Sequence, residues 1–267
     1  MGWARDVVRA VVGIGCAAMI GGCAGAGQTT PSGTTAGSGP TTTPSVSPSA
    51  TPTPTPTPTP TAIPTPTPTP TASAIPAEPV FTATATTITP ELAVRMAASW
   101  REGCPVALAD LRYLTLTYRG FDGSVHEGEL VVHADAADAI TQVFRTLFEV
   151  GYPIRSLRLV DDFGADDDAS MAADNTSAFN CRAIAGTRTW SQHAYGRAID
   201  LNPVENPYVS SSGVYPAAGA DFASRPDLPG VLHAGDAAVT AFATAGWPWG
   251  GQWPTTKDFQ HFSATGK

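Results

Sequence analysis

The sequence predicts a mixed α+β domain over residues 80–267, joined to an export signal (1–23) by a linker (24–79). Three observations indicate this organisation. Of the 25 prolines, 15 lie between Pro31 and Pro79. Residues 1–79 carry no net charge, so the formal charge of -8 belongs to the residues that follow. Short β-rich runs and helical patterns alternate only in that charged part, which is typical of one α+β domain.

The first 23 residues resemble a bacterial lipoprotein signal. Arg5 and Arg9 precede an apolar run, residues 10–20, that is too short to span a bilayer. The run ends in Ile-Gly-Gly-Cys, which matches a lipobox with Cys23 as the acylated residue. We expect a lipid on Cys23 to anchor the protein to the outer face of the cell membrane. The alternative is an ordinary secretory signal with an incidental cysteine.

Residues 24–79 are rich in Gly, Ser, Thr and Pro, with Thr-Pro repeats at 51–60 and 65–70. Alternating proline fixes φ and removes amide donors, so this segment cannot build a core. We predict a disordered, extended Pro/Thr-rich linker that reaches up to roughly 170 Å at about 3.1 Å per residue.

The domain's elements are predicted in order from local signals. Thr89-Pro90-Glu91 forms an N-cap and first turn for a helix reaching about Trp100. Strands over 112–118 and 128–133 flank Phe-Asp-Gly and form a hairpin. Apolar residues at helical spacing predict a helix over 135–149, which Gly-Tyr-Pro terminates. The remaining predicted elements are strands over 156–160, 197–201 and 258–262, and a helix over 236–245.

Charge and cysteine content restrict the function further. The acidic domain offers no basic stripe for phosphates, which argues against nucleic acid as a partner. We expect a monomer. Cys104 and Cys181 remain after signal processing and are predicted to form a disulfide outside the cytoplasm. The alternative, a pair of thiolate zinc ligands, lacks a third cysteine and any local Cys-x-x-Cys spacing.

The most informative stretch, residues 191–203, reads SQHAYGRAIDLNP. It places His193 and Asp200 seven residues apart, and Gly196 allows a tight turn between them. A later segment, residues 258–262, reads DFQHF and supplies His261 with Asp258 close by. One imidazole and one carboxylate from the first segment and one imidazole from the second are suitable metal ligands.

This pair of motifs resembles the D-Ala-D-Ala carboxypeptidase family of zinc peptidases, which includes vancomycin-resistance dipeptidases and phage L-alanyl-D-glutamate endolysins. The family signature is Ser-x-His-x-x-Gly-x-Ala-x-Asp, followed later by an acidic residue, two others and a histidine. Every fixed position is present, although Asp258 stands where the carboxypeptidases usually carry Glu. The resemblance covers roughly residues 100–267. It implies a hedgehog-like fold whose central antiparallel sheet carries the metal.

By the family pattern, Zn²⁺ is held by His193, Asp200 and His261, and Asp258 is the general base. Family members also use an arginine upstream of the first motif to stabilise the oxyanion. Arg182 is the candidate and Arg188 its rival. The resemblance implies hydrolysis of peptidoglycan stem peptides in the cell wall, by a D,D- or L,D-carboxypeptidase. The alternatives are an endopeptidase that cuts between L-Ala and D-Glu, and a zinc-containing wall-binding module without catalysis.

Two further features have open interpretations. An acidic cluster could bind calcium, but its spacing favours a solvated loop; its members are Asp161, Asp162, Asp166, Asp167, Asp168 and Asp174. The tryptophans of residues 247–253 could either wall a substrate cleft or close the core. The other histidines, His126, His133 and His233, are expected to be structural or superficial.

Overall fold

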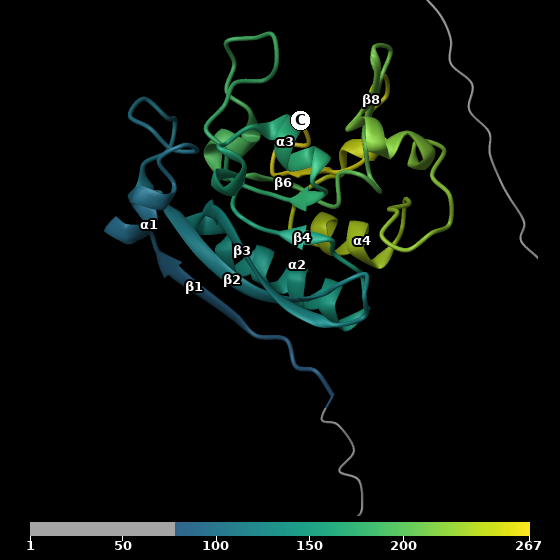
Figure 1. Ribbon diagram of the computed structural model, residues 1–267, viewed down its shortest axis with the longest axis horizontal. Helices are drawn as coiled ribbons and strands as arrows, with labels where there is room; N and C mark the ends of the chain where they lie inside the picture. The colour runs from purple at the N-terminus through teal and green to yellow at the C-terminus, as the bar shows by residue number, and fades with distance from the viewer. Residues whose placement is uncertain (1–77) are drawn as a thin grey trace, which may run out of the picture. The chain divides into compact units, whose positions relative to one another are not determined.

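The computed structural model describes residues 78–267, which hold the predicted α+β domain (Figure 1). The predictions for the export signal, Cys23 and all but the last two residues of the linker lie outside the described residues. Helices and antiparallel strands together confirm the α+β class. None of the helices within residues 78–267 has the length and apolarity needed to cross a membrane.

A three-stranded antiparallel sheet of order β1-β2-β3 opens the domain. The predicted hairpin is confirmed as β2 (Leu111–Arg119) and β3 (Val125–His133), paired from Leu111 opposite His133 to Arg119 opposite Val125. Sequence analysis missed the edge strand β1 (Ala83–Thr87). Its alternating Ala and Thr residues are mostly exposed, so no apolar stripe marks it, although its pairing with β2 is regular.

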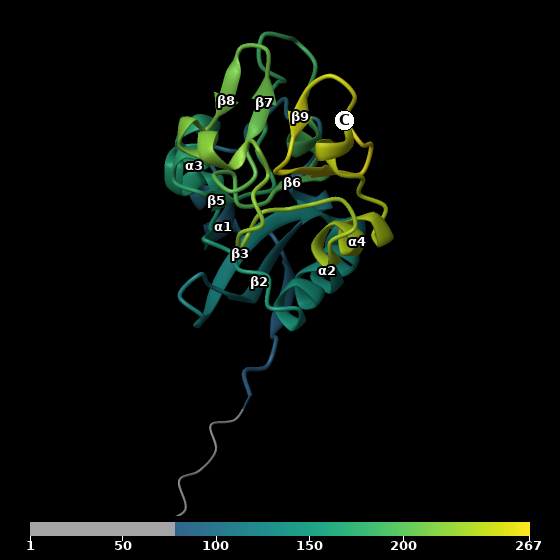
Figure 2. The same ribbon diagram turned by 90° about the vertical axis from the view of Figure 1, so that its right-hand side faces the viewer.

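Two helices pack beside this sheet and close the main core. α2 (Ala137–Glu149) covers one face of the sheet, and α4 (Ala237–Thr244) lies beside it (Figure 2). Both helices confirm the helices predicted over 135–149 and 236–245, and their ends agree with those ranges to within two residues. The apolar residues that predicted α2 do form its buried face. This face holds Ile140, Val143, Phe144 and Leu147, whereas the opposite face is solvated.

The short helix α1 (Pro90–Arg95) begins as predicted, with the Thr89 hydroxyl accepting from the amide of Leu92 at 3.3 Å. It ends five residues before the predicted end, and a turn carries the chain on to Trp100. Burial of Met96 fixes this turn in a second apolar cluster with Val106 and Phe179. Cys104 and Cys181 lie in the same region and form the predicted disulfide, with their Cα atoms 5.9 Å apart.

Two predicted strands differ from the structure. The strand over 156–160 is only β4 (Ser156–Leu157), which pairs in parallel with β5 (Asn175–Thr176), because a 3₁₀ helix begins at Val160. The strand over 258–262 is divided into β9 (Lys257–Asp258) and β10 (His261–Ser263). β9 and β10 belong to different sheets. The bend at residues 259–260 therefore separates Asp258, the predicted general base, from His261, a predicted metal ligand.

The remaining strands surround this bend. β10 pairs with β6 (Ala198–Asp200), which confirms the strand predicted at 197–201. β9 joins the hairpin of β7 (Tyr208–Ser210) and β8 (Gly213–Tyr215) in a sheet of order β8-β7-β9 (Figure 2). The segment that holds the acidic cluster contains one short α-helix, α3 (Asp167–Ala172). The 3₁₀ helices are η1 (Leu108–Asp110), η2 (Ala134–Ala136), η3 (Val160–Phe163), η4 (Gln192–Tyr195), η5 (Ala217–Phe222) and η6 (Gly250–Gln252).

The family resemblance implied that a central antiparallel sheet carries the metal. The candidate ligands do not lie on the long three-stranded sheet β1-β2-β3. Two of them lie on the two-stranded antiparallel pair β6–β10 instead. The segment from Ser177 to Phe179 connects the two sheets: Ser177 exchanges backbone hydrogen bonds with Asp200, and the amide of Phe179 donates to the carbonyl of Val131 on β3 at 3.1 Å.

Candidate metal centre and active-site cleft

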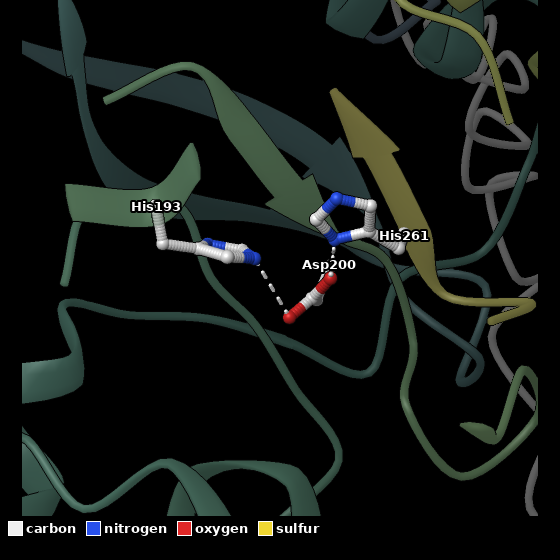
Figure 3. A group of neighbouring side chains, drawn as sticks. All are labelled: His193, Asp200 and His261. Atoms are coloured by element: carbon white, nitrogen blue, oxygen red, sulfur yellow. Dashed lines mark hydrogen bonds and ion pairs between the residues drawn. The ribbon is translucent and has the colours of Figure 1, made fainter. Parts of the chain in front are cut away.

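Three buried side chains from three elements converge at one point (Figure 3). His193 comes from η4, Asp200 from the end of β6, and His261 from the start of β10. Each offers one ligand atom, and these atoms lie within 4.8 Å of one another. The structure therefore brings together the three residues that the sequence motifs predicted as ligands. No second group of this kind occurs among residues 78–267.

The local sequence explains this convergence. Ser191 caps η4 by accepting from the amide of His193 at 3.3 Å, and Gly196 ends η4 in the left-handed conformation at φ 65°. The chain then enters β6, where Asp200 stands directly opposite His261 of β10. Opposite residues in an antiparallel pair share a face, so both side chains point to the same side while their neighbours pack in the core.

Hydrogen bonds orient both imidazoles toward the carboxylate. His193 donates from Nδ1 to the carbonyl of Ala178 at 2.5 Å, which leaves the Nε2 lone pair free. This Nε2 lies 3.1 Å from Oδ2 of Asp200 but is buried without a hydrogen-bonded partner. Nδ1 of His261 lies 2.9 Å from Oδ1 of Asp200, and its Nε2 is 3.4 Å from the backbone oxygen of Lys267.

The electrostatics of this group favour a positive charge beside Asp200. Burial opposes ionisation of Asp200, but the two histidines overcome it and hold the pKa of this carboxyl well below its ordinary value. Burial also opposes the charge on His261, yet Asp200 raises the pKa of this imidazole above its usual range. Two nitrogens and one carboxylate oxygen in a buried cluster are a donor set that zinc accepts. The Nε2 of His193, which is buried without a hydrogen-bond partner, is also suited to bind a metal ion.

Asp258 lines the same cleft as the three candidate ligands, as the sequence predicted. The residue is partly exposed, but its Oδ1 is buried and has no hydrogen-bond partner in the described structure. Burial raises the pKa of this carboxyl to about 6, with the negative charge of Asp200 adding to the rise and His261 opposing it. A carboxyl of this kind, near neutrality and not committed to a structural contact, is suited to proton transfer.

Arg182 also lines the cleft, whereas Arg188 is exposed on the loop beyond it. Nη2 of Arg182 lies 2.7 Å from Oδ2 of Asp167. The Arg182 backbone follows the disulfide-bonded Cys181 and accepts from the amide of Ser191 at 3.1 Å. Of the two predicted candidates, the structure thus places only Arg182 in the cleft.

Comparison with known families identifies the segment that builds this centre. Residues 185–264 match the D-alanyl-D-alanine carboxypeptidase family. The match confirms the resemblance over a narrower span than predicted, and it includes all three candidate ligands and Asp258, while Arg182 lies just before it. No curated protein and no solved structure matches the chain significantly. The family match supports a peptidase that acts on peptidoglycan peptides.

The cleft of the carboxypeptidase-like segment has a volume of about 630 Å³ and a mixed lining. Trp190, Tyr208 and Trp253 supply aromatic surface, and the Trp253 ring lies 5.6 Å from that of His261. Trp247 and Trp249 are instead buried in the core. Both of the positions that the sequence left open for the tryptophan-rich run are therefore occupied, the cleft wall by Trp253 and the core by Trp247 and Trp249.

The members of the acidic cluster do not group as candidate metal ligands within residues 78–267. Most of its carboxylates have protein partners: Asp161 accepts from the amide of Ser99, Asp162 pairs with Arg95 and Arg158, Asp166 caps α3, and Asp174 accepts from the amide of Val204. Of the six aspartates in the cluster, Asp167 is the one that lines the cleft. Sequence analysis missed this position, because nothing in a run of three aspartates distinguishes the one that turns inward.

Proposed function

We propose that the protein is a zinc-dependent peptidase that hydrolyses peptidoglycan stem peptides as a D,D- or L,D-carboxypeptidase. One observation carries the proposal: the buried His193, Asp200 and His261 share a cleft with Asp258, whose Oδ1 has no hydrogen-bond partner within the described residues, and all four lie in a segment that matches the D-alanyl-D-alanine carboxypeptidase family. A structural metal site has no need of a nearby carboxylate with an unpartnered, buried oxygen, which favours catalysis over a wall-binding module.

Zinc is the metal that this donor set suits best. Three protein ligands leave a fourth tetrahedral position open, which is typical of catalytic and not of structural zinc. When bound, zinc supplies a Lewis acid and lowers the pKa of a water molecule to about 7. The hydrogen bond from His193 Nδ1 to the carbonyl of Ala178 fixes the tautomer in which Nε2 can be a ligand.

Asp258 acts as the general base and then as the general acid. Its carboxylate takes a proton from the water that attacks the scissile carbonyl, and the resulting carboxyl returns that proton to the leaving amine. Burial favours the neutral carboxyl, which lets the group hold the proton between the two steps.

Arg182 stabilises the negative charge that develops on the carbonyl oxygen. Arg182 lines the cleft, and the positive charge of a guanidinium complements an oxyanion there. The disulfide at Cys181 restrains the backbone next to it. These features support Arg182 over Arg188, whose exposed side chain lies outside the cleft.

We also propose that the protein works outside the cytoplasm, anchored to the outer face of the cell membrane by a lipid on Cys23. The lipobox-like sequence supports the anchor, and the Cys104–Cys181 disulfide is consistent with an oxidising compartment. A Cys23→Ser variant should lose metabolic labelling with a palmitate analogue and move from the membrane fraction to the medium. Retention of the label in this variant would disprove the anchor.

Mass spectrometry of purified muropeptides incubated with the zinc-loaded protein tests the activity. Loss of a terminal alanine identifies a carboxypeptidase, whereas internal stem fragments identify an endopeptidase such as one that cuts between L-Ala and D-Glu. Asp258→Asn keeps the size of the side chain but should lower kcat by about 10²- to 10⁴-fold. His193→Ala should abolish activity, and His126→Ala, which changes an exposed histidine outside the cleft, should not. A folded, zinc-loaded protein without products would favour the binding module.

A further inference from the structure

Asp167 occupies an unusual place among the acidic-loop residues. It opens α3, yet its side chain turns away from the loop and lies in the cleft, 2.7 Å from Nη2 of Arg182. The side chains of both partners are largely covered, with 27% exposure for Asp167 and 28% for Arg182. An ion pair shielded to this degree is stronger than one on the open surface.

The fold alone does not account for this carboxylate. The N-cap of α3 is Asp166, which accepts from the amide of Ala169 at 3.0 Å, so the helix start does not depend on Asp167. Its position also disfavours a negative charge. Burial raises the pKa of the Asp167 carboxyl, Arg182 opposes this rise, and the nearby Asp200 adds to it. Asp167 therefore lies in the cleft at a cost in burial, which its ion pair with Arg182 partly offsets.

The contact with Asp167 restrains the side chain of Arg182. Its backbone is restrained by the disulfide at Cys181 and by the hydrogen bond from Ser191. Beyond that, the four-torsion side chain is free to choose among many rotamers. Within residues 78–267, the contact with Asp167 is the one ion pair that the guanidinium makes, and its Nε is buried without a hydrogen-bond partner. Asp167 thus fixes one end of a guanidinium whose other donors remain uncommitted.

We propose that Asp167 is a positioning residue that holds Arg182 ready to stabilise the oxyanion. This inference rests on the proposed peptidase function. Oxyanion stabilisation is effective only when the donor is in place before the charge develops, because reorganisation during the reaction costs free energy. Asp167 does not touch the reacting atoms. It acts through Arg182, and its loss is felt in the rate of the chemical step and not in the affinity for substrate.

A double-mutant cycle tests this dependence. Asp167→Asn keeps the shape of the side chain and should lower kcat by roughly 10- to 100-fold with KM nearly unchanged. In an Arg182→Ala background, the same change should have little further effect, because the group that it positions is gone. Asp168→Asn is the matched control, since Asp168 follows on the same helix and is exposed. It should match the unaltered protein in kcat and KM.

Two kinetic outcomes would overturn the proposal. Additive losses in the double variant would show that Asp167 acts independently of Arg182. A rise in KM alone, limited to stem peptides with a free side-chain amine, would show that Asp167 binds a substrate ammonium group instead.

A second measurement does not depend on activity. The Nε–Hε group of Arg182 should exchange with solvent slowly in the zinc-loaded protein and faster in Asp167→Asn, as seen by ¹⁵N NMR. Equal exchange in both would refute the positioning role even in an inactive protein. If the protein hydrolyses no muropeptide, the peptidase function fails, and the exchange rates still decide whether Asp167 holds Arg182.

Discussion

Glu205 is a buried acid outside the cleft that should make stability depend on pH. Its side chain is 5% exposed, and Oε2 is buried without a hydrogen-bond partner. Burial raises the pKa of Glu205 to about 7, with the neighbouring Asp174 adding to the rise and Arg155 opposing it. Near neutral pH, therefore, the folded protein holds a proton on Glu205 that the unfolded chain has released.

The direction of the effect follows from this difference in proton binding. Between the ordinary pKa of 4.5 and about 7, folding takes up a proton, so the free energy of unfolding falls as pH rises through this window. Glu205→Gln mimics the protonated acid. At pH 8 we expect it to be more stable than the unaltered protein by about 1–2 kcal/mol, and at pH 4.5 nearly equal to it. Urea denaturation at both pH values measures this, with the exposed Glu127→Gln as control. A gain that is the same at both pH values would refute the explanation.

Single residues were predictable from the sequence where chemistry fixes their spacing. His193, Asp200 and His261 follow from two motifs, because a metal-binding cluster tolerates few alternatives in residue type and order. Asp167 and Glu205 could not be identified in this way. Both are acidic residues in polar surroundings, and only the folded chain shows which carboxylates are turned inward.

At the level of elements, the turn at Gly196 sets the distance between the two ligands of the first motif. Its φ of 65° is in the left-handed region, and its carbonyl accepts from the amide of His133 on β3 at 2.8 Å. A Cβ at this position would lie 2.6 Å from that amide nitrogen. Because the neighbour is backbone, it cannot move aside without shifting β3.

Gly196→Ala should therefore lower the free energy of unfolding by at least about 2 kcal/mol and weaken zinc binding. Gly186→Ala is a matched control, because Gly186 has φ 73° but no atom near the Cβ position. It should show the smaller loss expected from backbone strain alone. Denaturant unfolding and zinc titration of both variants make the comparison. Equal losses would mean that the close approach to β3 has no influence.

α2 was predictable from its apolar period, and the β2–β3 hairpin from two β-rich runs around a turn. The division of the last strand into β9 and β10 was not, because residues 258–262 read as one β-rich run. Its cause is tertiary: Asp258 pairs with Tyr208 on β7, and His261 pairs with Asp200 on β6. One local pattern cannot show that two halves of a segment have different partners.

At the scale of the whole domain, the disulfide connects distant parts of the chain across 77 residues. It joins the loop after α1 to the segment that carries Arg182. Replacing both Cys104 and Cys181 by Ala should lower the free energy of unfolding by about 3–5 kcal/mol in the chain-entropy account. Denaturant unfolding of the oxidised, reduced and double-alanine proteins measures this. The reduced and double-alanine proteins should agree, and unchanged midpoints in both would contradict the prediction.

The proposed metal site should contribute to the stability of the whole domain, because its ligands come from three elements that meet only in the folded state. An ion that binds the folded but not the unfolded chain stabilises it by about 2.7 kcal/mol at a free concentration 100 times Kd. We expect the melting temperature to rise with added zinc and to fall on chelation. In His193→Ala this response should be largely lost, because two ligands hold zinc weakly, whereas His126→Ala should keep it in full. Thermal melts over a zinc titration provide the measurement. An equal rise in all three proteins would mean that zinc binds elsewhere, and the assignment of His193, Asp200 and His261 as a metal centre would have to be abandoned.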